Sequence, residues 1–204
     1  MTHDIAKAWS IIEGWFQKHA PGAFVPRPPA TQAQIDAAEA AIGYPLPDDY
    51  KQSLLLHDGV EQNAELAWLY APWLAPIDDC VQAWTDQREY DDEEELEAAE
   101  DEPVLPALNH PKRFPILGTA YWDYNVTYVD GAPGPAGKAG QIITLVSECD
   151  FEVTAGSFGA LWSRIAELME QDELEVFRDD VISVVHKADR RSLGDLLSQA
   201  PPGI

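Results

Sequence analysis

Apolar residues recur every three or four positions in the first part of the chain, which is the spacing of a buried helix face. Residues 4–19 predict an amphipathic helix, whose inner face consists of Ile5, Trp9, Ile12 and Phe16. A second helix is predicted from Thr31, because Gln34 stands three residues later and completes a capping box. The prolines between the two helices indicate an extended connector.

The stretch from 42 to 59, IGYPLPDDYKQSLLLHDG, predicts a tight corner between the second helix and a third. Gly43 is expected to adopt the left-handed conformation that ends a helix, and Pro45 prevents the helix from continuing. Leu46 precedes Pro47, which suits the start of the next helix because the N–H that proline lacks has no helical partner there. The residues of this stretch are therefore assigned folding roles rather than chemical ones.

The third helix is predicted to face inward through Tyr50, Leu54 and Leu55 and to end at Gly59. Two aspartates in its first turn lie where carboxylates stabilise the positive end of the helix dipole. The apolar and aromatic stretch that follows, residues 66–76, is expected to pack beneath the helices.

A further helix is predicted from Asp78, with Val81, Trp84 and Arg88 on related faces, and it runs into an acidic segment, residues 86–102. Eleven of the seventeen residues in this segment are acidic and one is basic. Such a segment is typical of a solvated helix end or a loop, and less often of a docking surface.

The second half of the chain is richer in aromatic and β-branched residues, which favour strands. Strands are predicted at residues 114–117, 120–130, 141–146 and 151–155. Residues 147–150 predict a hairpin turn, and the stretch GAPGPAGKAG, residues 131–140, predicts a loop between two strands.

The last part of the chain predicts one clear element and two weaker ones. Residues 157–171 form an amphipathic pattern for which Ser157 is the expected N-cap. Residues 181–185 are compatible with a strand, and residues 192–200 with a short final helix. We find no internal repeat and no composition shift that marks a domain boundary.

The chain of 204 residues carries 36 acidic and 13 basic side chains, a formal net charge of −23. This charge disfavours nucleic acid and anionic membranes as partners, because their phosphates would be repelled. It favours a cationic protein partner, or it serves solubility alone. The sequence predicts no secretory leader and no membrane-spanning segment, so the expected location is the cytoplasm.

Three features resemble catalytic motifs without meeting their requirements. In the loop 131–140, five residues separate Gly131 from Gly137 where a phosphate-binding loop needs four, and a strand follows instead of a helix. His57 stands before Asp-Gly as in metal phosphohydrolases, but the other histidines have no matching context. Cys149 has no histidine nearby in sequence and is interpreted as a structural thiol.

The order of these patterns resembles the SUKH superfamily, which is named partly after a fungal cell-wall assembly regulator. The helical corner is similar to the hallmark of that superfamily at Gly43, Leu46, Pro47, Tyr50 and Gly59. Later positions that resemble its motifs are Asp130, Pro133, Gly137, Gly140 and Phe158. The resemblance covers roughly residues 5–170.

This resemblance implies a protein of the α+β class, with a central antiparallel β-sheet and α-helices packed around it. We therefore expect one SUKH-like domain at residues 1–170 and a C-terminal extension at residues 171–204 that packs on the same domain. The resemblance also implies no cofactor and no catalytic residues. No metal site is expected either, because the two cysteines and the scattered histidines lack metal-ligand spacing.

Bacterial members of the superfamily are commonly cytosolic immunity proteins that bind a toxin, and fungal members act as regulators and scaffolds. The first hypothesis is therefore a cytoplasmic immunity protein that neutralises a basic toxin domain. The second is an intracellular regulatory scaffold. The third is a small hydrolase, which requires a pocket in which titratable groups converge.

Under the first hypothesis, acidic side chains would mimic the polyanionic substrate of a toxin that attacks nucleic acid, and exposed aromatic side chains would anchor the complex. Core packing is the alternative for each aromatic residue. The predicted partner-binding residues are Trp84, Tyr90, Asp91, Asp92, Glu93, Glu94, Glu95, Glu97 and Tyr124. The oligomeric state stays open.

Overall fold

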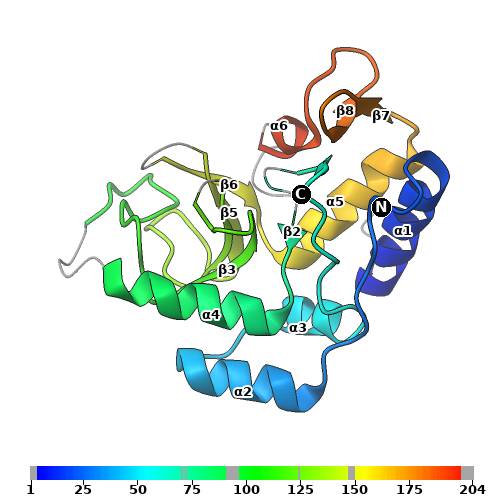
Figure 1. The fold of residues 1–204 in the computed structure, drawn as a ribbon. Helices are drawn as coiled ribbons and strands as arrows, with labels where there is room; N and C mark the ends of the chain where they lie inside the picture. The colour runs from blue at the N-terminus through cyan, green and yellow to red at the C-terminus, as the bar shows by residue number, and fades with distance from the viewer. Residues whose placement is uncertain are drawn as a thin grey trace.

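The computed structural model describes residues 4–69, 71, 73–90, 97–123, 125–146 and 150–198. Within these residues, six α-helices surround two β-sheets (Figure 1). All strand pairs but one are antiparallel. The α+β class and the mainly antiparallel sheet predicted above are therefore confirmed.

The larger sheet has five antiparallel strands in the order β2-β3-β4-β5-β6. Their bounds are Trp73–Leu74, Arg113–Gly118, Thr127–Asp130, Gln141–Leu145 and Phe151–Ala155. The smaller sheet has the order β1-β8-β7, with β1 and β8 parallel. Its bounds are Leu66–Ala67, Ile182–His186 and Leu174–Arg178.

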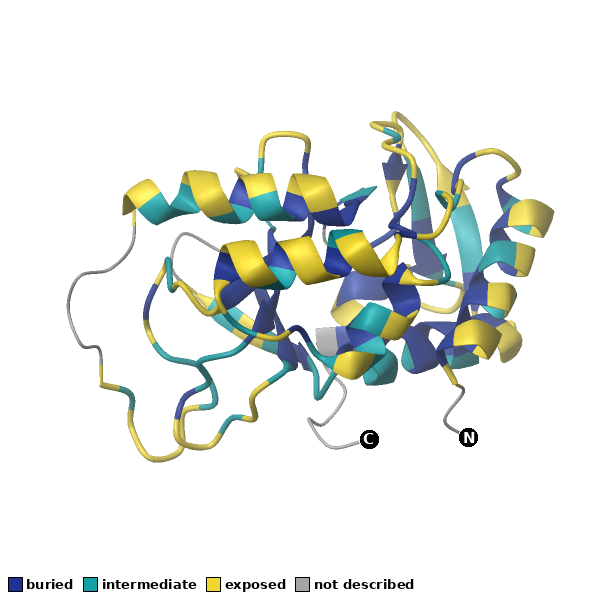
Figure 2. Cartoon of the chain, turned by 90° about the horizontal axis from the view of Figure 1, so that it is seen from below, coloured by how far each residue is buried: buried dark blue, intermediate teal, exposed yellow. Residues whose placement is uncertain are grey.

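The helices pack around the larger sheet as two groups. Their bounds, from α1 to α6, are Ile5–His19, Gln32–Ile42, Asp48–Leu54, Ile77–Gln87, Phe158–Glu170 and Leu193–Ser198. Helix α4 packs against β3, with α2 on its far side, and α1 packs against α5 (Figure 1). Along the helices, buried residues lie on the sides turned toward the rest of the chain and exposed residues on the outer sides, as Figure 2 shows.

Three tryptophans lie at the centre of the core and are almost completely inaccessible: Trp9, Trp68 and Trp162. The ring centroids of Trp9 and Trp162 are 5.1 Å apart, and those of Trp68 and Trp162 are 5.8 Å apart. Aromatic rings at such distances attract one another beyond the burial of their area. This cluster joins α1 and α5 to the chain that precedes β2.

The helical corner forms because its local signals agree with its packing. Thr31 and the side chain of Gln34 complete the capping box of α2. Gly43 ends that helix with φ 83°, and Pro47 is the N-cap of α3. Tyr50 is buried one turn later, with its ring centroid 5.1 Å from that of Phe158 at the start of α5.

The end of this corner differs from the prediction in two ways. Leu55 does not face inward, since 42% of its side chain is exposed. Helix α3 ends at Leu54 rather than at Gly59. Gly59 instead lies in a turn with φ 70°, where an added Cβ would overlap the carbonyl oxygen of Leu74. Close backbone approach, not helix termination, is what requires glycine there.

The strand predicted at residues 120–130 is much shorter than expected, because only Thr127–Asp130 forms β4. The preceding residues form a turn in which Trp122 and Asn125 have φ values of 54° and 51°. Left-handed backbone is incompatible with a strand and is rare for a residue as large as tryptophan. Its cause is tertiary, since the indole packs over Gly118 and against Trp73.

The C-terminal part adds one strand that the sequence did not predict. β7, Leu174–Arg178, contains two charged residues and no strict alternation of apolar and polar positions, so its sequence gave no clear strand pattern. The predicted strand and final helix appear as β8 and α6. Because β8 pairs with β1, this part of the chain continues a sheet begun in the first half. A domain division at residue 170 stays a prediction.

Candidate functional site

The acidic segment, residues 86–102, connects α4 to the chain that leads into β3. Six of its acidic residues are described, and all six are exposed: Asp86, Glu89, Glu97, Glu100, Asp101 and Glu102. No ion pair joins any of these six to another described residue. The predicted binding residues from Asp91 to Glu95, and Tyr124, lie outside the described residues.

The N-terminal end of the segment is held by contacts of α4 and of the 3-10 turn Arg88–Tyr90 that follows it. The indole Nε1 of Trp84 donates to the carbonyl oxygen of Pro111 at 2.9 Å, and the Arg88 guanidinium lies 4.7 Å from the Trp84 ring centroid. Asn109 Nδ2 donates to the Tyr90 carbonyl oxygen at 2.9 Å. These contacts fix the end of the helix against residues 109–111.

Trp84 on α4 and Tyr90 in the turn after it, the two predicted aromatic anchors described here, therefore differ in how accessible they are to a partner. Trp84 is half-buried, its N–H is already bonded, and a guanidinium covers its ring. The side chain of Tyr90 is 70% exposed. We therefore assign Trp84 to holding the segment and keep Tyr90 as a candidate contact for a partner.

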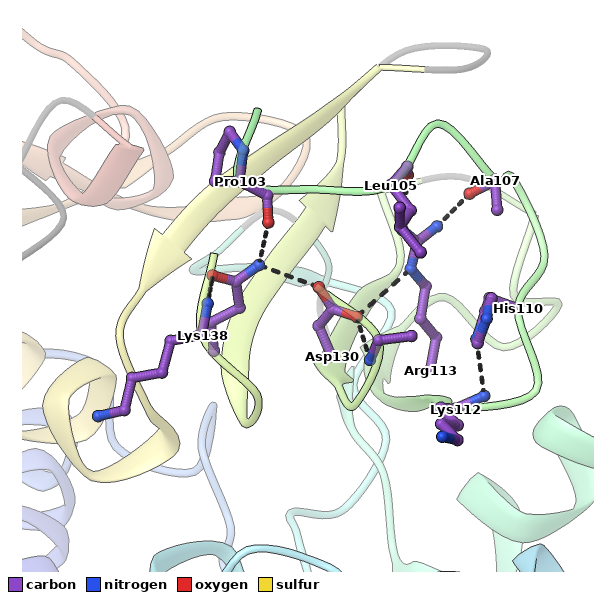
Figure 3. A network of polar contacts seen from close by, with 10 residues as sticks. Pro103, Leu105, Ala107, His110, Lys112, Arg113, Asp130 and Lys138 are labelled. Atoms are coloured by element: carbon purple, nitrogen blue, oxygen red, sulfur yellow. Dashed lines mark hydrogen bonds and ion pairs between the residues drawn. The ribbon is translucent and has the colours of Figure 1, made fainter. Parts of the chain in front are cut away.

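The C-terminal end of the segment is held by a buried polar network on three neighbouring strands (Figure 3). Arg113, Asp130 and Gln141 stand in register on β3, β4 and β5. Arg113 and Asp130 are 1% and 0% exposed, and Arg113 Nε lies 3.7 Å from Asp130 Oδ1. The strand register therefore brings a charge pair together inside the protein.

Other donors of this network bind backbone carbonyl oxygens of residues 103–107, which follow the acidic segment. The Arg113 guanidinium donates to the carbonyl oxygens of Ala107 and, at 2.7 Å, of Leu105. Gln141 Nε2 donates to Asp130 Oδ2 at 3.0 Å and to the Pro103 carbonyl oxygen at 2.8 Å. Buried charges are stable only when they are paired and hydrogen-bonded in this way.

The glycine-rich loop, residues 131–140, completes the attachment. Pro133 forms a bridge with Val104, and Gly134 N donates to the Pro103 carbonyl oxygen at 3.0 Å. A Cβ on Gly137 would overlap that same carbonyl oxygen. The loop therefore packs against the backbone of residues 103–104, and it is not a phosphate-binding loop.

The far end of this loop contacts the helical corner. Gly140 has φ 85°, donates its N–H to the Asp130 carbonyl oxygen at 2.7 Å, and lies beside Pro47. Pro47 and Gly140, which resemble family motifs in two distant parts of the sequence, are thus neighbours in the structure. They hold together the base from which the acidic segment emerges.

The charge of the acidic segment is not offset by a neighbouring histidine. Partial burial and the nearby Arg113 lower the pKa of His110 below its usual range. Its Nδ1 accepts a hydrogen bond from Lys112 N at 3.0 Å, as the neutral ring requires. His110 is therefore neutral at pH 7 and adds no positive charge near this end of the segment.

The alternative of hydrolytic chemistry finds little support around His57. His57 lines a cavity of about 550 Å³ together with Ser10 and Glu13. Its Nε2 lies 2.9 Å from Glu13 Oε1, and its Nδ1 lies 3.0 Å from the Arg27 carbonyl oxygen. Since both ring nitrogens are engaged, neither is placed to take a proton from Ser10.

Other reactive groups have structural environments. Asp58 Oδ1 accepts from Ile77 N at 2.8 Å and so caps α4, whose N-cap is a proline. Burial raises the pKa of the Cys80 thiol, which keeps it protonated and unreactive.

Over the part of the chain that the structure describes, no three His, Cys, Asp or Glu side chains are grouped to hold a metal ion. None of the described helices is both long and apolar enough to cross a membrane.

Sequence patterns missed several residues of this region. Arg113 is the first residue of an otherwise apolar strand, and that was the available signal for a buried pair. Tyr121 stood in a stretch taken for a strand, yet its side chain is 84% exposed. Leu108 and Asp123 gave no signal, because only the folded chain places them near the segment.

Two comparisons with known proteins agree with this architecture. A model of the SMI1/KNR4 family (SUKH-1) matches residues 29–164, from the connector before α2 into α5. A glucan synthesis regulatory protein from Neurospora crassa is 24% identical over 203 residues, covering 80% of this chain and 38% of that protein. The chain thus spans well under half the length of this relative. The acidic segment and both of its attachments lie inside the matched family region.

Proposed function

Because the chain belongs to the SMI1/KNR4 family (SUKH-1), we propose that it is a non-catalytic protein-binding module whose acidic segment contacts a basic partner protein. The family match confirms the resemblance that the corner motif indicated. It agrees with a regulatory or immunity-type module. The function proposed here adds the contact surface and the charge of the partner.

One observation carries this proposal: six exposed carboxylates without ion pairs to described residues extend from a base that is held at both ends. Charges that are held close together raise the local electrostatic potential and accelerate association with an oppositely charged protein. The fixed ends also limit the conformational entropy lost when the segment is bound. Both effects favour binding without any chemical step.

The specific form that we propose is an immunity protein that binds a basic toxin and covers its active site in the cytoplasm. The net charge of −23 supports a partner whose own substrate is polyanionic. The second candidate is a regulatory scaffold, which the printed name of the Neurospora crassa relative favours. A single tight partner distinguishes the first from the second, which predicts several weak ones.

The test uses the protein encoded by the neighbouring reading frame as the partner, with association rates measured against salt concentration. We expect the on-rate to fall steeply as salt rises, because screening removes electrostatic steering. Substituting Glu97→Gln, Glu100→Gln, Asp101→Asn and Glu102→Gln together should lower the low-salt on-rate about tenfold.

A matched control removes four exposed charges elsewhere. Substituting Glu65→Gln, Glu173→Gln, Asp179→Asn and Asp180→Asn gives the same change in net charge far from the segment. This control should leave most of the on-rate intact. Equal losses in the two variants would show that net charge acts without a dedicated surface. Tight binding that is indifferent to salt would contradict the electrostatic mechanism.

A further inference from the structure

A groove of about 330 Å³ lies beside the first residues of the acidic segment. Two segments with exposed side chains form its walls: the end of α4 with Tyr90, and the turn that contains Tyr121 and Asp123. Leu108 lies at its edge, and Tyr128 of β4 at its floor. The volume is near the lower limit of ligand sites, about 300 Å³, and accommodates side chains rather than a whole helix.

The walls of this groove present aromatic surface to solvent. Tyr121 and Tyr90 are 84% and 70% exposed, the highest values among the large apolar side chains that the structure describes, and Leu108 is 38% exposed. Exposed apolar surface that gathers at one place marks interaction sites, whereas single exposed residues do not. Tyrosine is also among the residue types most often found as binding hot spots.

The floor of the groove belongs to a small apolar cluster separate from the main core. Val126, Tyr128 and Ile143 are buried in this cluster, on the sheet face away from the central tryptophans. Burial raises the pKa of Tyr128 to about 12, so its phenol is neutral. The groove therefore combines an uncharged apolar floor with exposed aromatic walls.

Among the described residues that line the groove, the charged side chains are the carboxylates of Asp86 and Asp123, and none is a lysine, arginine or histidine. Asp123 Oδ1 accepts a hydrogen bond from Thr119 Oγ1 at 2.5 Å, which closes the turn and holds the carboxylate at the wall. The acidic segment continues directly from Tyr90. An apolar side chain entering this groove is therefore favoured when a positive charge accompanies it.

The turn that forms one wall is held in an unfavourable backbone conformation. Left-handed backbone at Trp122 is unfavourable for so large a residue, and packing of the indole against Trp73 offsets this strain. With the indole turned inward, the side chains on either side of it, Tyr121 and Asp123, are both exposed. The strain thus keeps one aromatic and one acidic group facing a partner.

We propose that this groove is the docking site for a partner segment in which an arginine or lysine stands next to an apolar side chain. The apolar side chain packs between Tyr90 and Tyr121, and the cation lies between the carboxylates of Asp86 and Asp123. Arginine also stacks on tyrosine faces. This inference rests on the proposed function, since it assumes a protein partner.

The test uses the full chain, isotope-labelled, and three short amidated peptides as probes: Gly-Arg-Trp-Arg-Gly, Gly-Glu-Trp-Glu-Gly and Gly-Arg-Ala-Arg-Gly. The first should shift the NMR signals of Tyr90, Tyr121 and Asp123 with a Kd on the order of 1 mM. The acidic peptide should cause no shift, and the alanine peptide should bind about tenfold more weakly.

Substitution separates the groove from general charge attraction. Tyr121→Ala should weaken binding of the first peptide about tenfold, and its folding is safe because the side chain is mostly exposed. Phe177→Ala, at another exposed aromatic on β7, is the matched control and should leave affinity unchanged. Equal binding of the arginine peptides, or an unchanged affinity in Tyr121→Ala, overturns the groove assignment.

Two further outcomes separate this inference from the proposed function. If the acidic-segment variant loses on-rate while Tyr121→Ala leaves partner affinity intact, the groove assignment is wrong and the proposed function stands. If the peptides bind in the groove but no protein partner binds the acidic segment, the proposed function is wrong. Concentration-dependent shifts of the same signals without peptide would identify a second copy of the chain as the occupant and overturn the assignment.

Discussion

Two neighbouring regions of this protein use charge in opposite ways. Around Arg113 and Asp130 the charges are buried, paired and hydrogen-bonded to backbone. In the acidic segment that this network attaches, the described carboxylates are exposed and form no ion pairs with described residues. The same residue types thus stabilise a unique chain path in one region and remain available to a partner in the other.

The difference teaches that environment, not residue type, separates structural from functional charges. A buried pair contributes little net stability, because desolvation offsets its attraction, but removing one partner is costly. An exposed charge contributes little to stability whether it is present or absent. The two regions should therefore respond to substitution on different scales.

The largest expected effect is at the buried pair. Arg113→Met leaves Asp130 charged and buried without its cation, and should lower the free energy of unfolding by about 3–5 kcal/mol. Urea denaturation followed by circular dichroism measures this loss. Adding Asp130→Leu should restore part of it, and the four-charge variant of the acidic segment should stay within about 0.5 kcal/mol of the wild type. A loss below about 1 kcal/mol in Arg113→Met would remove the contrast between the regions.

A smaller effect is expected at the loop that holds the segment. Gly137→Ala places a methyl group against the carbonyl oxygen of Pro103, so the attached backbone must move, and we expect a loss of about 1–3 kcal/mol. Limited proteolysis should then cut near residues 97–102 faster, which shows that the attachment has loosened. Gly14→Ala is the control, because nothing lies near its added Cβ and alanine stabilises a helix interior by about 0.5–1 kcal/mol. Equal stability changes in the two variants would refute the steric argument.

The smallest effect concerns Asp58, which lies between the two extremes, since it is buried but has no ion pair with a described residue. Burial raises its pKa in the folded state, so protonation favours the fold. The contribution is fully present below the unfolded pKa of about 3.9 and is lost as pH rises through the raised value.

Asp58→Asn keeps the oxygen that caps α4 and removes the titration. We expect the variant to match or exceed wild-type stability at pH 7, by less than about 1 kcal/mol. Its advantage should shrink as pH falls below the raised pKa. Thermal unfolding measured across this pH range checks the sign. A difference that stays constant with pH would show that the charge of Asp58 does not matter.

The sequence was most informative where structure depends on neighbours in the chain. The capping box at Thr31 and the glycine at position 43 are local signals, and the structure follows them. The backbone at Trp122 depends on distant packing, so no local pattern predicted it. β7 has no strict alternation of apolar and polar residues, so it was recognised only through its pairing with β8 on the next segment.

The candidate site was predictable only in part. The density of acidic residues marked the segment, and Tyr90, for which core packing was the alternative, is exposed. The groove could not be predicted, because its walls come from α4, the turn at residues 121–123 and β4, which meet only in the folded chain. Trp84 shows the opposite problem, since an aromatic that suited a partner has its contacts inside the protein.

The double attachment of the acidic segment has a consequence for how such proteins diversify. Since both ends are secured by contacts outside the intervening stretch, that stretch can lengthen or change composition without disturbing the scaffold. Doubling a flexible loop costs only about 0.6 kcal/mol in closure entropy. Under the proposed function, exchanging this segment between relatives would transplant partner preference onto an unchanged framework.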